Sequence, residues 1–115
     1  MMNQLPLLGA VATLLLGLLG LFAPTKAAQF VGIKPDGLLG LSELRATYGG
    51  VFVGMGLLCL MRPSATAFSV AAACWLGAAL ARLVSIGVDR SYSAKNAGGV
   101  LLEAILGGAF LAGAI

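Results

Sequence analysis

Four apolar runs, each close to the length of a membrane-spanning helix, dominate this sequence. A helix needs about 20 predominantly apolar residues to cross the hydrocarbon core of a bilayer. The runs cover residues 5–23, 38–61, 65–88 and 97–115. They lack the alternation of polar and apolar positions that a transmembrane β-strand requires. The sequence therefore predicts an all-α fold, a four-transmembrane-helix antiparallel bundle that forms a single integral membrane domain over residues 1–115.

The amino-acid composition excludes the soluble and disordered classes. Only 10% of the residues are charged and 60% are hydrophobic, whereas about 25% are charged in an ordinary soluble domain. A disordered chain would carry far less apolar surface. The net charge is +3, but the basic residues form no stripe of the kind that binds nucleic acid. The expected partner is the lipid bilayer, and no nucleic acid is expected.

The residue types that most enzymes and metal sites use are scarce. The chain has no histidine, which removes the commonest general base and metal ligand. Cys59 and Cys74 lie inside apolar runs without a Cys-x-x-Cys spacing, which favours small buried hydrophobes over metal ligands or a disulfide. No paired nucleophile and base and no phosphate-binding loop are present. We therefore expect no catalytic residue, no metal, no cofactor and no enzymatic activity.

Basic residues predict the orientation of the chain in the membrane. Connections one (residues 24–37) and three (89–96), with the adjoining helix ends, carry most of them: Lys26, Lys34, Arg45, Arg82, Arg90 and Lys95. The opposite side has Arg62. The positive-inside rule then places connections one and three in the cytoplasm and both termini outside. The first run is expected to be a retained helix rather than a signal peptide, and Asp36 is expected to cap the second helix.

Small residues at four-residue intervals predict where the helices pack. In lipid, helices approach one another where side chains are small. The candidate packing positions are Gly50 and Gly54 in the second run, Ala73, Gly77 and Ala81 in the third, and Gly99 and Gly107 in the fourth. Packing within one bundle is the expected use of these faces, and a homodimer face is the alternative.

Ionisable side chains inside the apolar runs predict a polar cluster. Arg82 is seven residues before Asp89, and Glu103 is seven residues after Asn96. In an antiparallel hairpin both lie about 10 Å below the connection, at a rise of 1.5 Å per residue. Since a charge at that depth costs at least about 2.5 kcal/mol, each needs a partner. An Arg82–Glu103 ion pair is therefore predicted.

The second run adds further polar groups to the same leaflet. Glu43 and Arg45 lie near its start, and Tyr48 is one turn after Arg45, so its hydroxyl could donate into the group. The cluster either fixes the orientation and register of the helices or lines a cavity for a proton, an ion or a small ligand. The first use predicts a structural or accessory membrane protein. The alternative is a small transporter or channel that uses Glu103 and Arg82.

One octapeptide carries a resemblance to a known family. The segment Glu43–Gly50 reads Glu-Leu-Arg-Ala-Thr-Tyr-Gly-Gly. It resembles the E-L-R-A-x-Y-G-G signature of a family of small four-helix integral membrane proteins of bacteria. That family is classified as a domain of unknown function. The resemblance implies a multi-pass protein of the bacterial inner (plasma) membrane and brings no activity, substrate or cofactor. A homo-oligomer or a larger membrane complex is the expected protein partner. Gly49-Gly50 would allow a kink or close backbone approach beside Tyr48.

Overall fold

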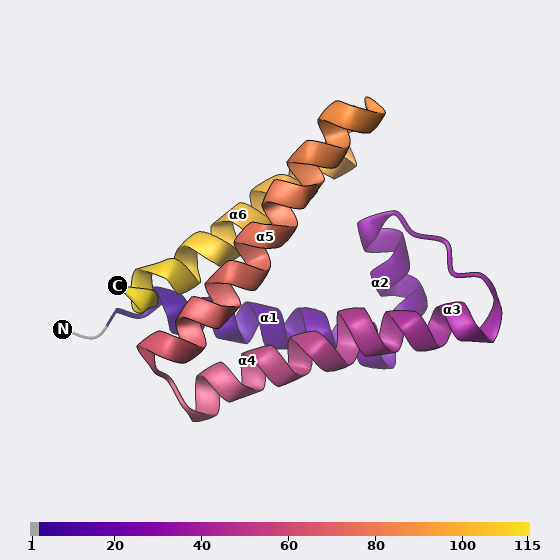
Figure 1. Ribbon diagram of the computed structural model, residues 1–115. Helices are drawn as coiled ribbons and strands as arrows, with labels where there is room; N and C mark the ends of the chain where they lie inside the picture. The colour runs from indigo at the N-terminus through magenta and orange to yellow at the C-terminus, as the bar shows by residue number, and fades with distance from the viewer. Residues whose placement is uncertain (1–2) are drawn as a thin grey trace. The chain divides into compact units, whose positions relative to one another are not determined.

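The computed structural model describes residues 3–115, and all its regular elements are helices, with no strand in that range (Figure 1). Its elements are α1 (Leu5–Phe22), α2 (Pro24–Val31), α3 (Gly37–Leu44), the π-helix η1 (Arg45–Gly50), α4 (Val51–Met61), α5 (Ala65–Asp89) and α6 (Ala94–Ala114). Four spans are long and apolar enough to cross a membrane: α1, the continuous stretch Gly37–Met61, α5 and α6. The predicted all-α fold with four spans is confirmed.

The largest difference in helix bounds lies at the start of α6, which begins at Ala94 rather than at residue 97. Ser93 caps this helix, because its side chain accepts a hydrogen bond from the Asn96 backbone N–H at 3.1 Å. Lys95 and Asn96 therefore lie in a polar first turn of α6. A prediction from apolar runs leaves this turn out, because its residues are polar.

The helices form two compact units. One unit is Ala10–Arg62, and the other combines the residues up to Gly9 with Pro63–Ile115. In both units, large apolar side chains along the spans are exposed, among them Leu8, Leu15, Leu80, Val84 and Ile105. Runs of exposed apolar side chains are rare on soluble monomers, and lipid is the solvent that suits them. The single-domain organisation stays a prediction.

Connection one contains a helix that the sequence analysis did not predict. Helix α2 starts with Pro24 in its first turn, a position where the missing proline N–H costs nothing. It ends at Gly32, whose φ of 83° is left-handed and favours glycine. The helix buries Pro24, Ala27 and Ala28 and packs against α3 and η1.

The second span is interrupted by a turn of π-helix. Residues Arg45–Gly50 form η1 between α3 and α4, so the span is not one uniform α-helix. The predicted cap at its start is wrong: Asp36 occupies the N-cap position, but its side chain makes no capping hydrogen bond. Its backbone carbonyl instead accepts from the Gly40 N–H at 3.2 Å. The Asp36 side chain instead lines a hollow, together with Glu43 and Thr47.

Within the first unit, α1 crosses the second span through glycines. A Cβ at Gly20 would collide with the Tyr48 carbonyl, and a Cβ at Gly49 would lie 2.9 Å from Leu21 Cα. Gly56 faces α1 in the same way, since its Cβ would lie 2.8 Å from the Ala10 carbonyl oxygen. The backbones therefore meet directly, as small-residue interfaces in lipid allow.

The glycines selected from the sequence lie beside this crossing rather than in it. A Cβ at Gly54 would have no neighbour within 4 Å, and a Cβ at Gly50 would meet only the Arg45 carbonyl oxygen at 3.8 Å. The helix face that contacts α1 instead includes Gly49 and Gly56.

In the second unit, α5 and α6 run side by side as an antiparallel hairpin (Figure 1). Side chains of α5 pack directly against glycines of α6. A Cβ at Gly107 would lie 2.6 Å from Leu76 Cγ, and a Cβ at Gly113 would lie 2.6 Å from Phe68 Cδ2. The Phe68 and Phe110 rings pack with centroids 6.3 Å apart.

The predicted packing stripe on α5 lies off this contact. Ala73, Gly77 and Ala81 are exposed, and a Cβ at Gly77 would have no neighbour within 4 Å. The face of α5 that is buried instead includes Ala72, Trp75 and Ala79. That the stripe faces another helix stays a prediction.

Candidate functional site

The α5–α6 hairpin holds a bidentate salt bridge. Arg82 donates from Nε to Glu103 Oε1 at 2.8 Å and from Nη2 to Glu103 Oε2 at 3.0 Å. Two parallel N–H···O bonds fix the planar guanidinium against the planar carboxylate, which is the strongest geometry for this pair. The ion pair predicted from the two seven-residue spacings is confirmed.

Asn96 extends the salt bridge to connection three. Arg82 Nη1 donates to Asn96 Oδ1 at 3.0 Å. The Asn96 amide nitrogen in turn donates to the Ser91 carbonyl oxygen at 3.1 Å and to its Oγ at 2.8 Å. Sequence reasoning used Asn96 only as a depth marker. The signal that could have found it is its spacing of seven residues from Glu103, which places both on one face of α6.

Gly99 provides the space for this network. A Cβ at Gly99 would lie 2.8 Å from Arg82 Nε and 2.9 Å from Arg82 Cζ. The guanidinium therefore lies across the backbone of α6 at a position where any side chain would displace it. Gly99 is one turn before Glu103, so both residues lie next to the Arg82 side chain.

The two side chains of the salt bridge are largely buried, and they are hydrogen-bonded to each other. Glu103 is 8% exposed, and the Arg82 side chain is 28% exposed. Within residues 3–115, no buried side-chain nitrogen or oxygen lacks a hydrogen-bond partner. A buried charge pair is tolerated when its remaining donors and acceptors are also satisfied, and this network meets that condition.

Within residues 3–115, the predicted cluster of four charges is reduced to one salt bridge, which joins Arg82 and Glu103. Glu43 and Arg45 belong to the other unit and are exposed. Neither side chain has a hydrogen bond or ion pair within residues 3–115. Tyr48 lies on η1, where its ring meets the Phe52 ring edge-on, with centroids 6.0 Å apart.

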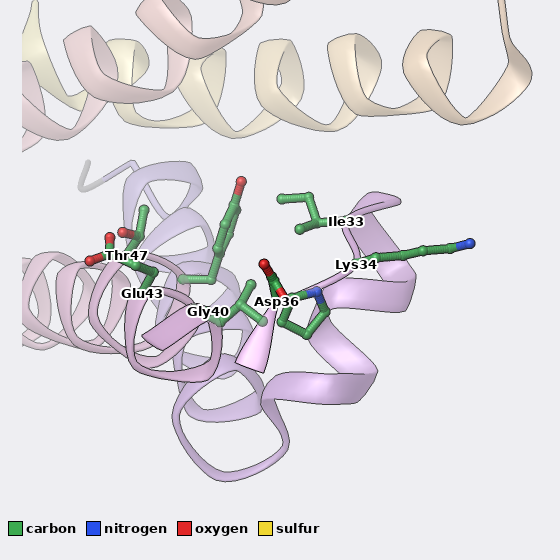
Figure 2. A pocket seen from close by; sticks show the side chains of 9 residues that line it. Ile33, Lys34, Asp36, Gly40, Glu43 and Thr47 are labelled. Atoms are coloured by element: carbon green, nitrogen blue, oxygen red, sulfur yellow. The ribbon is translucent and has the colours of Figure 1, made fainter. Parts of the chain in front are cut away.

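A hollow of about 250 Å³ lies in the unit Ala10–Arg62, between the α2–α3 connection and the second span (Figure 2). Residues from the connection, from α3 and from η1 line it: Ile33, Lys34, Pro35, Asp36, Gly40, Glu43, Leu44, Thr47 and Tyr48. The π-helix contributes Thr47 and Tyr48. Single turns of π-helix often occur at functional sites, because the wider turn redirects side chains.

The charges around this hollow are separated from one another. Figure 2 shows Glu43 and Thr47 next to each other, whereas the Lys34 side chain extends away from them. Asp36 lies between these positions in the same view. Sequence analysis identified Glu43 and Tyr48 as polar groups of the second span. It did not join them to Lys34 and Asp36, because it treated the connection as a loop.

Comparison with known proteins places the chain in a family. Residues 2–114 match the family model described as "Domain of unknown function (DUF4345)". The chain belongs to this family. No curated protein matches the chain, and no solved structure does.

Proposed function

We propose that this DUF4345 protein is a structural or accessory membrane protein, in which the Arg82–Glu103 salt bridge fixes the register of the α5–α6 hairpin. One observation carries the proposal. Both Glu103 oxygens accept from Arg82, and the guanidinium also donates to Asn96. These three partner atoms belong to residues within 82–103 of one hairpin. Hydrogen bonds that join the two helices of a hairpin in this way support a role in specifying helix orientation.

A small transporter or channel is the competing function. A transporting carboxylate has to exchange its partner for a proton, an ion or a substrate during each cycle. In this hairpin the Glu103 carboxylate is buried and forked to Arg82, which favours the structural role. The two functions differ in what a neutral side chain at position 103 would do.

Flux measurements in liposomes test the proposal. We expect wild-type protein and Glu103→Gln, each reconstituted in liposomes loaded with a pH-sensitive dye, to show no proton flux above empty liposomes. The variant should instead be less stable, because Arg82 loses the charge of the Glu103 carboxylate. Wild-type flux that Glu103→Gln abolishes while the variant stays folded would establish the transporter. The Glu43→Gln variant is the matched control, since Glu43 has the same charge and no partner within residues 3–115.

We propose that the protein acts beside a larger membrane complex or as a homo-oligomer in the inner membrane of a bacterium. The short connections between α4 and α5 and between α5 and α6 support this role. We also propose that connections one and three face the cytoplasm, on the basis of the positive-inside rule.

Cysteine labelling tests this orientation. In a Cys59→Ala, Cys74→Ala background, a cysteine introduced at Ser64 should react with a membrane-impermeant maleimide in intact spheroplasts. A cysteine at Tyr92 should react only after the membrane is opened. Tyr92 is exposed and Ser64 lies in connection two, so both thiols are accessible on their own side. The reverse pattern of labelling would overturn the assigned orientation.

A further inference from the structure

Helix α6 is long enough to cross a bilayer, but its composition gives it little net tendency to enter one alone. Five glycines and six alanines make up about half of its 21 residues, and such small side chains remove little apolar surface from water. Glu103 lies near the middle of the helix, nine residues after Ala94 and eleven before Ala114. On insertion scales, one charge at the centre of a span offsets the gain from about seven large apolar side chains. The large apolar residues of α6 are Val100, Leu101, Leu102, Ile105, Leu106, Phe110 and Leu111.

Helix α5 also carries a charge, but the position of that charge is less costly. Arg82 is seven residues before Asp89, the last residue of α5, and so lies about 10 Å below the connection. The long side chain of an arginine near a helix end can extend to the interface, where its guanidinium stays hydrated. A glutamate side chain is too short to do the same from the middle of α6. α5, which is synthesised first, can therefore enter the bilayer without a partner, whereas α6 cannot.

The turn between the two helices is closed by bonds within the hairpin itself (Figure 1). The backbone N–H groups of Arg90 and Ser91 both donate to the Ile86 carbonyl oxygen, the second of them at 3.1 Å. The Asn96 side chain donates to Ser91 and accepts from Arg82. The same amide thus ties the turn to the salt bridge. All these groups belong to α5, α6 and their connection, so the bonds can form as soon as this segment has been synthesised.

We infer that α6 enters the membrane as part of a hairpin with α5, in which Arg82 supplies the charge that Glu103 needs to enter lipid. Arg82 donates to both Glu103 oxygens across the backbone at Gly99. Pairing therefore replaces two isolated charges with one neutral, hydrogen-bonded unit, which is less costly to remove from water than a lone carboxylate. This inference rests on the proposed structural role of the salt bridge, and it adds that the pair already acts during insertion.

The side of the membrane on which α6 ends measures the inference. Two single-cysteine proteins, Tyr92→Cys and Ile115→Cys, are made in a Cys59→Ala, Cys74→Ala background by cell-free synthesis with inverted membrane vesicles. Both positions are exposed, and a membrane-impermeant maleimide labels the thiols that face outwards. With Arg82 present, we expect the two thiols to lie on opposite sides in nearly all chains. With Arg82→Leu, the Ile115→Cys thiol should lie on the Tyr92 side in about half of the chains, because the gain and the cost of inserting α6 then nearly cancel.

Three further variants separate insertion from the stability of the folded hairpin. Glu103→Leu breaks the salt bridge but leaves no charge in the middle of α6, so α6 should cross in nearly all chains even though the free energy of unfolding is lowered. The Arg82→Leu, Glu103→Leu double variant should cross equally well. Arg45→Leu is the matched control, because it removes the same charge from an exposed position in another span. It should leave the crossing of α6 unchanged.

Three results would overturn the inference. If α6 crosses in nearly all Arg82→Leu chains, Glu103 enters lipid without its partner. If Glu103→Leu and Arg82→Leu lose crossing equally, insertion follows the stability of the folded hairpin and not the charge of the carboxylate. If Arg45→Leu loses as much crossing as Arg82→Leu, the effect comes from the number of positive charges near the membrane. None of these results changes the flux expected for wild-type protein and Glu103→Gln, so the structural role and the insertion step fail separately.

Discussion

Replacing Glu103 with leucine is expected to lower the free energy of unfolding by about 3 kcal/mol, the lower end of the cost of breaking a buried ion pair. The loss arises because Arg82 stays beside the backbone of α6, over Gly99, with no carboxylate to neutralise it. Its Nη1 bond to Asn96 offers only a neutral acceptor. Denaturant unfolding in detergent micelles, followed by circular dichroism, measures the change.

The Arg82→Leu, Glu103→Leu double variant separates two explanations of that loss. If the single variant is unstable because it leaves an uncompensated charge, removing both charges should restore stability to within about 1 kcal/mol of wild type, since apolar replacements of buried pairs are often neutral or stabilising. A double variant as unstable as the single one would show that the salt bridge itself supplies the stability. That result would contradict the role in specificity proposed here.

Glu43→Leu is the matched control for this series. It makes the same chemical change within the second span, but Glu43 is exposed and has no partner within residues 3–115. Its effect should stay within about 0.5 kcal/mol, as is usual for surface substitutions. If Glu43→Leu and Glu103→Leu lower the free energy of unfolding equally, the loss would come from removing any charge in the micelle. It would then not come from breaking the Arg82–Glu103 salt bridge.

The sequence predicts those features that depend on depth alone. Hydropathy locates the four spans, because length and apolar content decide whether a helix can cross a bilayer. The distances of Arg82 and Glu103 from connection three also convert directly into depth, because both helices leave the same short connection. An isolated charge at that level needs a partner, and so the salt bridge could be found by counting.

Features that depend on helix rotation could not be found in this way. Gly49 and Gly50 are adjacent residues of the same type and lie at nearly the same depth. Only Gly49 contacts α1, since a Cβ there would lie 2.9 Å from Leu21 Cα. A π-turn changes the number of residues per turn within Arg45–Gly50, so the face that follows cannot be extrapolated from a uniform α-helix. The hollow was missed for a related reason. Its lining includes residues just after α2, and no helix is predicted from the sequence within connection one.

The glycine crossing of α1 leads to the second large expected effect. Gly20→Val should lower the free energy of unfolding by about 3 kcal/mol, the upper end of typical overpacking costs. The Cβ would collide with the Tyr48 carbonyl carbon and oxygen, and it would also lie 2.9 Å from the Gly49 backbone nitrogen. These are backbone atoms, so no rotamer change can relieve the collision. The helices have to separate, and their contacts along the crossing weaken.

Gly54→Val is the control for this prediction. It adds the same side chain to a helical glycine in a neighbouring span, where a Cβ has no neighbour within 4 Å, and its effect should stay within about 0.5 kcal/mol. Gly49→Val, on the opposite side of the crossing, should be as damaging as Gly20→Val. The two changes together should cost less than their sum, because helices already separated by one valine accommodate the other. Equal stability of Gly20→Val and Gly54→Val would mean that α1 does not pack on η1 through this crossing.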